Sequence, residues 1–280
     1  MLGKHLKHEF RATGRILLPL MGAVIVLALL ANGSMTMLAN GMADSSAAAK
    51  FAGLRILLIL IVVMFFIGIV TMAVMTVVLM VSRFYRNLLK DEGYLMFTLP
   101  VSTHELVWAK LIVSFVWFIA AGLLIFLVLS LSALNLSGTE LRLIFEQFPS
   151  WSEIREALKE AGILDRATLM LVQGILVVIL STLVTCLHFY AGMSLGHMFA
   201  KNRILLSIAF FIAISIAFSI METAGMSGIM ERGVFSAQDS GEFFRSSATV
   251  VWYGIIMKAG EAALLYFVTV LSLNKGLNLA

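Results

Sequence analysis

The sequence predicts an all-α membrane protein with six transmembrane helices. Of its 280 residues, 61% are hydrophobic and 13% are charged, whereas about a quarter of the residues of a soluble domain are charged. Six apolar runs approach or exceed the ~20 residues that a helix needs to cross a bilayer. The chain has only three prolines, which suits long uninterrupted helices.

The apolar runs define the expected spans within a single transmembrane domain over residues 1–280. The expected spans are residues 16–38, 54–82, 106–133, 168–199, 204–221 and 248–273. We expect residues 222–247, which include several glycines, to form a polar loop. Residues 135–166 form the longest polar stretch, and Ser150 followed by Glu153 predicts a capped short helix within it.

Residues 1–15 predict a basic amphipathic helix. One face carries Lys4, Lys7, His8, Arg11 and Arg15, and another carries Leu2, Leu6 and Phe10. Such a helix suits the membrane interface, although the segment is equally explained as a positive flank of the first span. A basic leader before an apolar run also resembles a signal peptide. We favour a retained span because the apolar run is longer than a signal core.

The distribution of Lys and Arg predicts the orientation. Eleven of them fall in the short segments on one side of the six-span layout, and eight are spread over longer segments on the other. The positive-inside rule then places both termini and the connection between spans two and three in the cytoplasm. It makes residues 135–166 extracytoplasmic. We therefore expect a multi-pass protein of the plasma membrane.

The connection between spans two and three is unusually apolar for a short aqueous segment. It contains Tyr94, Leu95, Met96, Phe97 and Leu99. Exposed apolar groups of this density indicate a surface that another molecule covers. We interpret the segment as a docking site for a soluble partner protein. The alternative is that residues 95–99 fold back onto the protein's own helices.

Local signals divide this connection into a helix, an apolar elbow and a second helix. Basic residues at helical spacing after position 82 extend span two, and Gly93 is a plausible C-terminal cap. Pro100 ends any helix through the apolar residues. Ser102 and Glu105 have the spacing of a capping box that begins the next helix.

The same connection resembles a known protein family. Asp91-Glu92-Gly93, followed by residues 97–102 (FTLPVS), then Leu106 and Lys110, is similar to the first cytoplasmic loop of ABC exporter permeases of the ABC-2 type. The six-span layout with an N-terminal interfacial helix resembles that family more loosely. The long outer segment 135–166 departs from the family pattern.

This resemblance implies a coupling helix that docks on a separate ABC ATPase subunit. The residues that it assigns to docking and coupling, together with two neighbours, are Asp91, Glu92, Gly93, Tyr94, Phe97, Thr98, Leu99, Pro100 and Ser102. It also implies two ATPase copies per complex and a second permease, either identical or related. ATP and Mg²⁺ would bind in the ATPase, because this chain lacks a phosphate-binding G-x-x-x-x-G-K-[ST] motif. We expect no cofactor bound by this chain.

Residues 192–196 (GMSLG) match two different patterns. G-x-S-x-G marks a nucleophile elbow, but that motif needs a strand, a sharp turn and a helix, and here it ends an apolar helix. Gly192 and Gly196 also form G-x-x-x-G, which allows helices to approach closely in lipid. We favour helix packing and expect no catalytic residue.

Lys258 and Glu261 are the only opposite charges well inside an expected span. Their i, i+3 spacing lets the two side chains meet. A charge at the centre of a bilayer costs about 2.5–3.5 kcal/mol on insertion scales. The two residues could be a self-satisfied pair, line a polar substrate path or lie at a subunit interface.

Several function classes are disfavoured by the sequence. The single cysteine, Cys186, excludes an intrachain disulfide, and His188 and His197 lie on different helix faces, so we expect no metal site. The sequence has no basic patch with interleaved aromatic residues, so it gives no sign of nucleic-acid binding. The remaining alternatives are an ion-coupled secondary transporter that uses Lys258 and Glu261, the membrane scaffold of an importer, and an intramembrane enzyme. The sequence does not identify a substrate.

Overall fold

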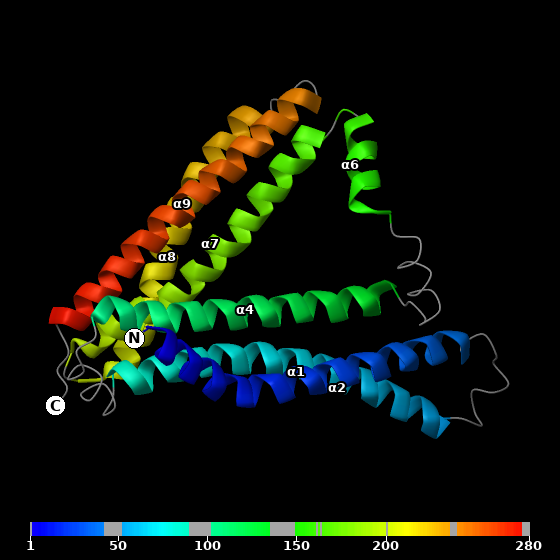
Figure 1. Ribbon diagram of the computed structural model, residues 1–280, viewed down its shortest axis with the longest axis horizontal. Coiled ribbons are helices and arrows are strands. Elements are labelled where there is room, and N and C mark those ends of the chain that lie inside the picture. The colour runs from blue at the N-terminus through cyan, green and yellow to red at the C-terminus, as the bar shows by residue number, and fades with distance from the viewer. Residues whose placement is uncertain are drawn as a thin grey trace. The chain divides into compact units, whose positions relative to one another are not determined.

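Seven α-helices make up the described part of the computed structural model, which covers residues 2–41, 52–89, 102–134, 149–160, 162, 164–199, 201–235 and 240–275 (Figure 1). The helices are α1 (Leu2–Gly41), α2 (Ala52–Phe84), α4 (Thr103–Leu134), α6 (Trp151–Glu160), α7 (Leu164–His197), α8 (Arg203–Ile229) and α9 (Ser240–Lys275). All except α6 are long and apolar enough to cross a membrane. The expected all-α multi-pass membrane fold with six spans is therefore confirmed.

The chain forms two compact units. The α1 unit contains residues 3–80 and 116–150, and the α7–α9 unit contains residues 81–115 and 151–280. Helices α2 and α4 each contribute residues to both units.

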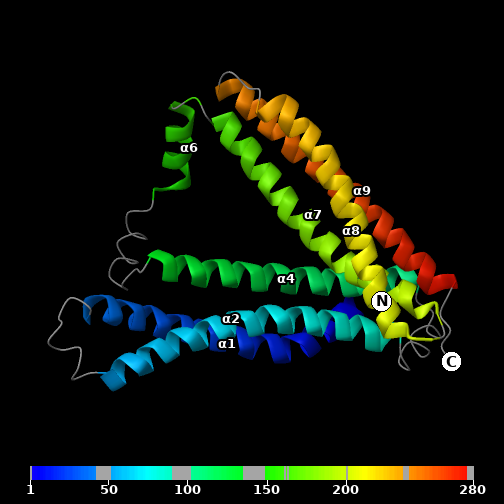
Figure 2. The ribbon, with the colours of Figure 1, turned by 180° about the vertical axis from the view of Figure 1, so that it is seen from behind.

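The core of the α1 unit lies where α1, α2 and α4 run side by side (Figures 1 and 2). Its buried members are Val24, Ala28, Ala31, Phe65, Met72, Ala121 and Val128. The members from α1 and α4 are alanines and valines, whereas those from α2 are the larger Phe65 and Met72. Gly68 contributes to this packing, because a Cβ there would lie 3.1 Å from a methyl group of Leu27.

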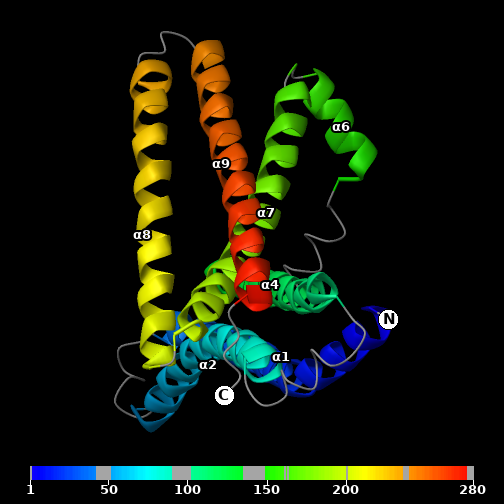
Figure 3. The ribbon, with the colours of Figure 1, turned by 90° about the vertical axis from the view of Figure 1, so that its left-hand side faces the viewer.

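Residues 1–15 and the first expected span are not separated by a break. From Leu2 onward they form the single helix α1, which has Pro19 in its interior. Figures 1 and 3 show that the first turns of α1 run in a different direction from the rest of the helix. Proline explains this bend, because it lacks the N–H of the helical hydrogen bond and its ring clashes with the preceding turn. The described basic side chains of the first turns, including Lys7, Arg11 and Arg15, are exposed as expected.

A buried hydrogen bond links the bent end of α1 to α4 within the α1 unit. Trp117 Nε1 donates to Thr13 Oγ1 at 2.8 Å. The Thr13 hydroxyl in turn donates to the Glu9 carbonyl oxygen at 2.8 Å. The indole also lies 3.3 Å from where a Cβ on Gly14 would be placed. The glycine therefore makes the room that the tryptophan needs.

Replacement of Thr13 by valine is expected to destabilise the protein by about 1–3 kcal/mol, because it leaves the Trp117 N–H without its acceptor. The midpoint of thermal unfolding of the purified protein measures the effect. Thr36→Val is the matched control, since within the described residues the Thr36 hydroxyl donates to the Gly33 carbonyl on its own helix, in an exposed hydrogen bond that links no second helix. Equal midpoints for the two variants would contradict a stabilising role of this hydrogen bond.

In the α7–α9 unit, α7 packs against both α8 and α9, and Figure 3 shows the ribbons of α7 and α8 coming together toward the end of α7. Two glycines allow the close approach to α8. A Cβ on Gly192 would lie 3.0 Å from Phe211 Cβ, and a Cβ on Gly196 would overlap the backbone of Ser207. Residues on the other face of α8 are exposed, among them Ile204, Ile208 and Ile212.

The expected polar loop over residues 222–247 was largely wrong. Helix α8 continues to Ile229, a π-helix (η2) covers Met230–Val234, and α9 begins at Ser240. Glycine disfavours an isolated helix by about 1 kcal/mol relative to alanine, which explains the interpretation as a loop. Packing overrides this preference, because Gly225 lies directly against the Tyr253 ring of α9.

Both predicted capping boxes precede helices. Helix α6 occupies Trp151–Glu160, directly after Ser150. Helix α4 begins at Thr103, and the Glu105 backbone N–H donates to Ser102 Oγ at 3.3 Å. The expected extension of span two is also present, since a π-helix (η1, Tyr85–Leu89) continues α2. The remaining coupling residues, Asp91, Glu92, Gly93, Tyr94, Phe97, Thr98, Leu99 and Pro100, lie outside the described residues.

Candidate functional site

Four ionisable side chains from three spans meet inside the α7–α9 unit. His188 comes from α7, Glu222 from α8, and Lys258 and Glu261 from α9. We name this group the charge cluster. Each member lies within a candidate membrane span, where ionisable residues are rare and by default mark a functional site.

Lys258 holds the two carboxylates of the charge cluster. Its Nζ donates to Glu261 Oε2 at 3.0 Å and lies 2.8 Å from Glu222 Oε2. The first contact joins adjacent turns of α9, and the second joins α9 to α8. Pairing of opposite charges offsets part of the cost of removing each from water.

Burial differs across the charge cluster. The side chain of Glu261 is 4% exposed and that of His188 is 12% exposed, whereas Lys258 and Glu222 are each about one quarter exposed. In a membrane-spanning helix, surface exposure means contact with lipid, another subunit or a transport path. Glu222 and Lys258 therefore form the open side of the charge cluster, and Glu261 and His188 form its closed side.

His188 connects the charge cluster to α7. Its Nε2 lies 3.3 Å from Glu261 Oε1, and its Nδ1 lies 3.1 Å from the Val184 carbonyl oxygen one turn earlier. The rings of Phe211 and Phe218 on α8 meet the imidazole edge to face, each with its centroid 6.2 Å away. Apolar rings thus surround the imidazole on the α8 side.

Sequence reasoning found two members of the charge cluster and missed two. Lys258 and Glu261 were identified as an intramembrane pair, and they do meet. Glu222 was missed because the fifth span was expected to end at residue 221, before the glycines that follow. His188 was considered only as a metal ligand. Its position within an apolar run was the signal for an intramembrane polar contact.

The G-x-S-x-G match has no nucleophile geometry in the described residues. Ser194 lies inside α7, and its hydroxyl donates to the Ala191 carbonyl at 3.1 Å. A nucleophile elbow requires a sharp turn between a strand and a helix. Gly192 and Gly196 instead lie at the closest approach of α7 to α8, and this approach holds α8 in register with α7.

The helix ends on either side of residues 90–101 are fastened to α7 and α9. On the α2 side, the Phe84 ring stacks on Tyr190 of α7 with centroids 4.0 Å apart. The Tyr190 hydroxyl also lies 2.6 Å from Ser114 Oγ of α4. Tyr190 is 1% exposed, so one buried ring connects three helices.

On the α4 side, the first two turns contact the end of α9. Thr103 Oγ1 donates to Asn274 Oδ1 at 2.6 Å, and His104 Nδ1 lies 2.7 Å from the Tyr266 hydroxyl. Tyr190 is two residues from His188, and Tyr266 is five residues from Glu261. The anchors of the connecting segment therefore lie on α7 and α9, two of the three helices that carry the charge cluster.

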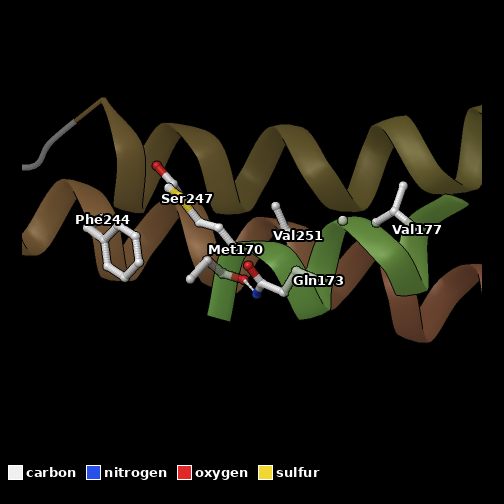
Figure 4. Close-up of a pocket in the computed structure, with 8 residues that line it drawn as sticks. Met170, Gln173, Val177, Phe244, Ser247 and Val251 are labelled. Atoms are coloured by element: carbon white, nitrogen blue, oxygen red, sulfur yellow. Dashed lines mark hydrogen bonds between the residues drawn. The ribbon is translucent and has the colours of Figure 1, made fainter. Parts of the chain in front are cut away.

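An open groove lies between α7 and α9, away from the charge cluster in sequence (Figure 4). It encloses about 300 Å³ and is lined mostly by apolar groups of Met170, Val177, Phe244 and Val251. Its one amide, Gln173, donates through Nε2 to the Ala248 carbonyl at 3.1 Å. The groove presents an apolar surface whose amide already has a partner, so it does not resemble a site for polar chemistry.

Among the described residues, no group of three or more His, Cys, Asp or Glu side chains is placed to hold a metal ion. No protein-family model, curated protein or solved structure matches the chain.

Proposed function

We propose that this protein is the transmembrane permease subunit of an ATP-driven exporter of the ABC-2 type. In this proposal a separate ATPase subunit, present in two copies, binds ATP and Mg²⁺ and docks on residues 91–102. A second permease copy or a related chain completes the transport path. The protein lies in the plasma membrane with both termini in the cytoplasm. It performs no covalent chemistry itself.

The observation that carries this proposal is the anchoring of both helix ends that flank residues 90–101. Phe84 is tied to Tyr190, and Thr103 and His104 are tied to Asn274 and Tyr266. Force applied to the intervening segment is therefore delivered to α7 and α9. Closure of the ATPase pair would shift these helices and so change access to the transport path. Coupling between two sites requires an element that both sites contact and that can take up two arrangements.

Phe97→Asp combined with Leu99→Asp is expected to abolish association with the ATPase, because two carboxylates would enter an apolar contact. The measurement is the stoichiometry of an ATPase subunit that co-purifies with the full chain from its native membrane. We expect stoichiometric ATPase with the unmodified chain and at least a tenfold loss with the double variant.

Phe235→Asp is the matched control, because Phe235 is 76% exposed and ends η2, in the connection between α8 and α9. The six-span topology puts that connection on the opposite side of the membrane from residues 90–101, so this variant should keep the ATPase. A folded unmodified chain that carries no ATPase would overturn the exporter proposal. Equal loss in Phe235→Asp would assign the effect to the introduced charge and not to the docking surface.

The charge cluster favours a second candidate, an ion-coupled secondary transporter. Intramembrane acid and base residues are typical of ion and proton pathways. The two candidates differ in their energy source. A carrier would move its substrate in vesicles that contain this chain alone and an imposed ion gradient, whereas a permease subunit would require the ATPase and ATP.

A further inference from the structure

Two facing atoms at the closed side of the charge cluster lack hydrogen bonds. Glu261 Oε1 and His188 Nε2 are both buried, and within the part of the chain that the structure describes neither has a hydrogen-bond partner. They nevertheless lie 3.3 Å from each other. Buried polar atoms of folded proteins are almost always hydrogen-bonded, so this pair calls for a physical explanation.

The other ring nitrogen of His188 restricts the possible protonation states. Nδ1 lies 3.1 Å from the Val184 carbonyl oxygen, which can only accept a hydrogen bond, and a neutral imidazole has one N–H and one lone pair. With the hydrogen on Nδ1, the Nε2 lone pair faces the Glu261 carboxylate. With the hydrogen on Nε2, the Nδ1 lone pair faces the Val184 carbonyl. In each neutral form, therefore, one ring nitrogen and an oxygen face each other as two hydrogen-bond acceptors with no hydrogen between them.

One additional proton removes this conflict. Placed on the ring, it makes both nitrogens donors, to Val184 and to Glu261. Placed on Glu261 Oε1, it lets the carboxyl group donate to Nε2 while Nδ1–H donates to Val184. We propose that His188 and Glu261 form an intramembrane proton-binding site that holds one exchangeable proton between Nε2 and Oε1.

The charges of the neighbouring groups agree with this proposal. The titratable groups that face the pair are Glu222 from α8 and Lys258 from α9. With the proton on His188, the carboxylates of Glu222 and Glu261 balance the cations of Lys258 and His188. With the proton on Glu261, the carboxylate of Glu222 balances the cation of Lys258. Without it, the charge cluster carries a net negative charge inside the membrane, which is unfavourable. Proton exchange occurs at the open side, past Glu222 and Lys258. The site does not depend on the ATPase proposed above.

The chain contains an internal control in the same helix. His197 also places its Nδ1 3.1 Å from a carbonyl oxygen one turn earlier, that of Met193. Its ring meets the edge of Tyr85, with centroids 5.1 Å apart. Within the described residues it is not paired with a carboxylate. His197 should therefore be a neutral ring with its hydrogen on Nδ1.

The experiment is nitrogen-15 magnetic resonance of the full chain in lipid bilayers near neutral pH. Residues 187–188 are the only Leu-His pair among the five histidines, so paired labelling of Leu and His identifies His188 without mutation. We expect either two protonated ring nitrogens on His188, or a neutral ring together with a protonated Glu261 carboxyl group in the infrared spectrum. Raising the pH should remove this proton. Paired labelling of Gly and His identifies His197 in the same way, because residues 196–197 are the only Gly-His pair in the sequence, and the His197 signals should not change.

A singly protonated His188 together with an ionised Glu261 would overturn the proposal, as would a signal that does not respond to pH in the folded protein. Glu261→Gln provides the second test. It should turn an imidazolium into a neutral ring, or remove the carboxyl band. Persistence of the imidazolium in Glu261→Gln would show that the proton does not belong to this pair. The ring-nitrogen signals of His188 in the unmodified chain, and their response to pH, decide the proposal even if this variant does not fold.

Discussion

Replacement of Gly196 by alanine is expected to separate α7 from α8 and to destabilise the protein strongly. The new Cβ would overlap the backbone nitrogen and Cα of Ser207. Backbone atoms cannot move away as the end of a flexible side chain can, so the whole helix must shift. Overpacking a well-fitted contact costs about 1–3 kcal/mol and sometimes more. We expect Gly196→Ala at the upper end of this range.

The expected change in stability at Gly196 is opposite in direction to the usual effect of replacing glycine by alanine in a helix. In an exposed helix, glycine to alanine stabilises by about 1 kcal/mol. Gly174 lies in the same helix, and a Cβ there would meet no atom within 4 Å. Thermal unfolding of the purified protein should therefore give a lower midpoint for Gly196→Ala and an equal or higher one for Gly174→Ala. A higher midpoint in both variants would contradict the close approach of α7 and α8.

Gly192→Ala should give a smaller loss at the same helix contact. Its Cβ would lie 3.0 Å from Phe211 Cβ and 3.1 Å from Phe211 Cα, which a displacement of a few tenths of an ångström could relieve. From the most to the least stable variant, the expected order is therefore Gly174→Ala, Gly192→Ala and Gly196→Ala.

Removal of the Lys258 charge is expected to cost about 3 kcal/mol, the lower end of the range for breaking a buried ion pair from one side, because Lys258 and Glu222 are each about one quarter exposed. Lys258→Gln would leave Glu222 and Glu261 without the ammonium group that both contact at 3.0 Å or less. Glu261 is 4% exposed and Glu222 is 27% exposed, so solvent replaces this cation only in part. The measurement is the unfolding midpoint of the purified protein. Lys258→Arg, which keeps the charge, should retain most of the stability.

A second substitution distinguishes lost charge balance from lost packing. Glu222→Gln combined with Lys258→Gln removes one carboxylate as well, so the double variant should be more stable than Lys258→Gln alone. Such non-additivity is expected for residues in one ionic network. Lys201→Gln, at an exposed position between α7 and α8, serves as the control and should change stability by less than about 0.5 kcal/mol. Simple additivity of the two cluster substitutions would contradict the network.

The starts of two helices could be predicted from short polar signals. Ser102 precedes α4 and accepts the hydrogen bond of a capping residue, and Ser150 precedes α6. Such signals act over three or four residues, so they can be read locally. The end of α8 could not be predicted in this way. Its glycines disfavour a helix, and it is the Tyr253 ring of another helix that packs against Gly225.

The sequence by itself determined that this is a helical membrane protein with six spans. Lipid offers no hydrogen-bond partners, so an apolar segment of sufficient length must satisfy its backbone internally as a helix. Only the tertiary structure decided which polar groups inside the spans meet. His188, Glu222 and Glu261 are distant in sequence, and their contact depends on how the helices pack side by side. The glycine contacts between α7 and α8 set part of that register, and hydropathy does not encode it.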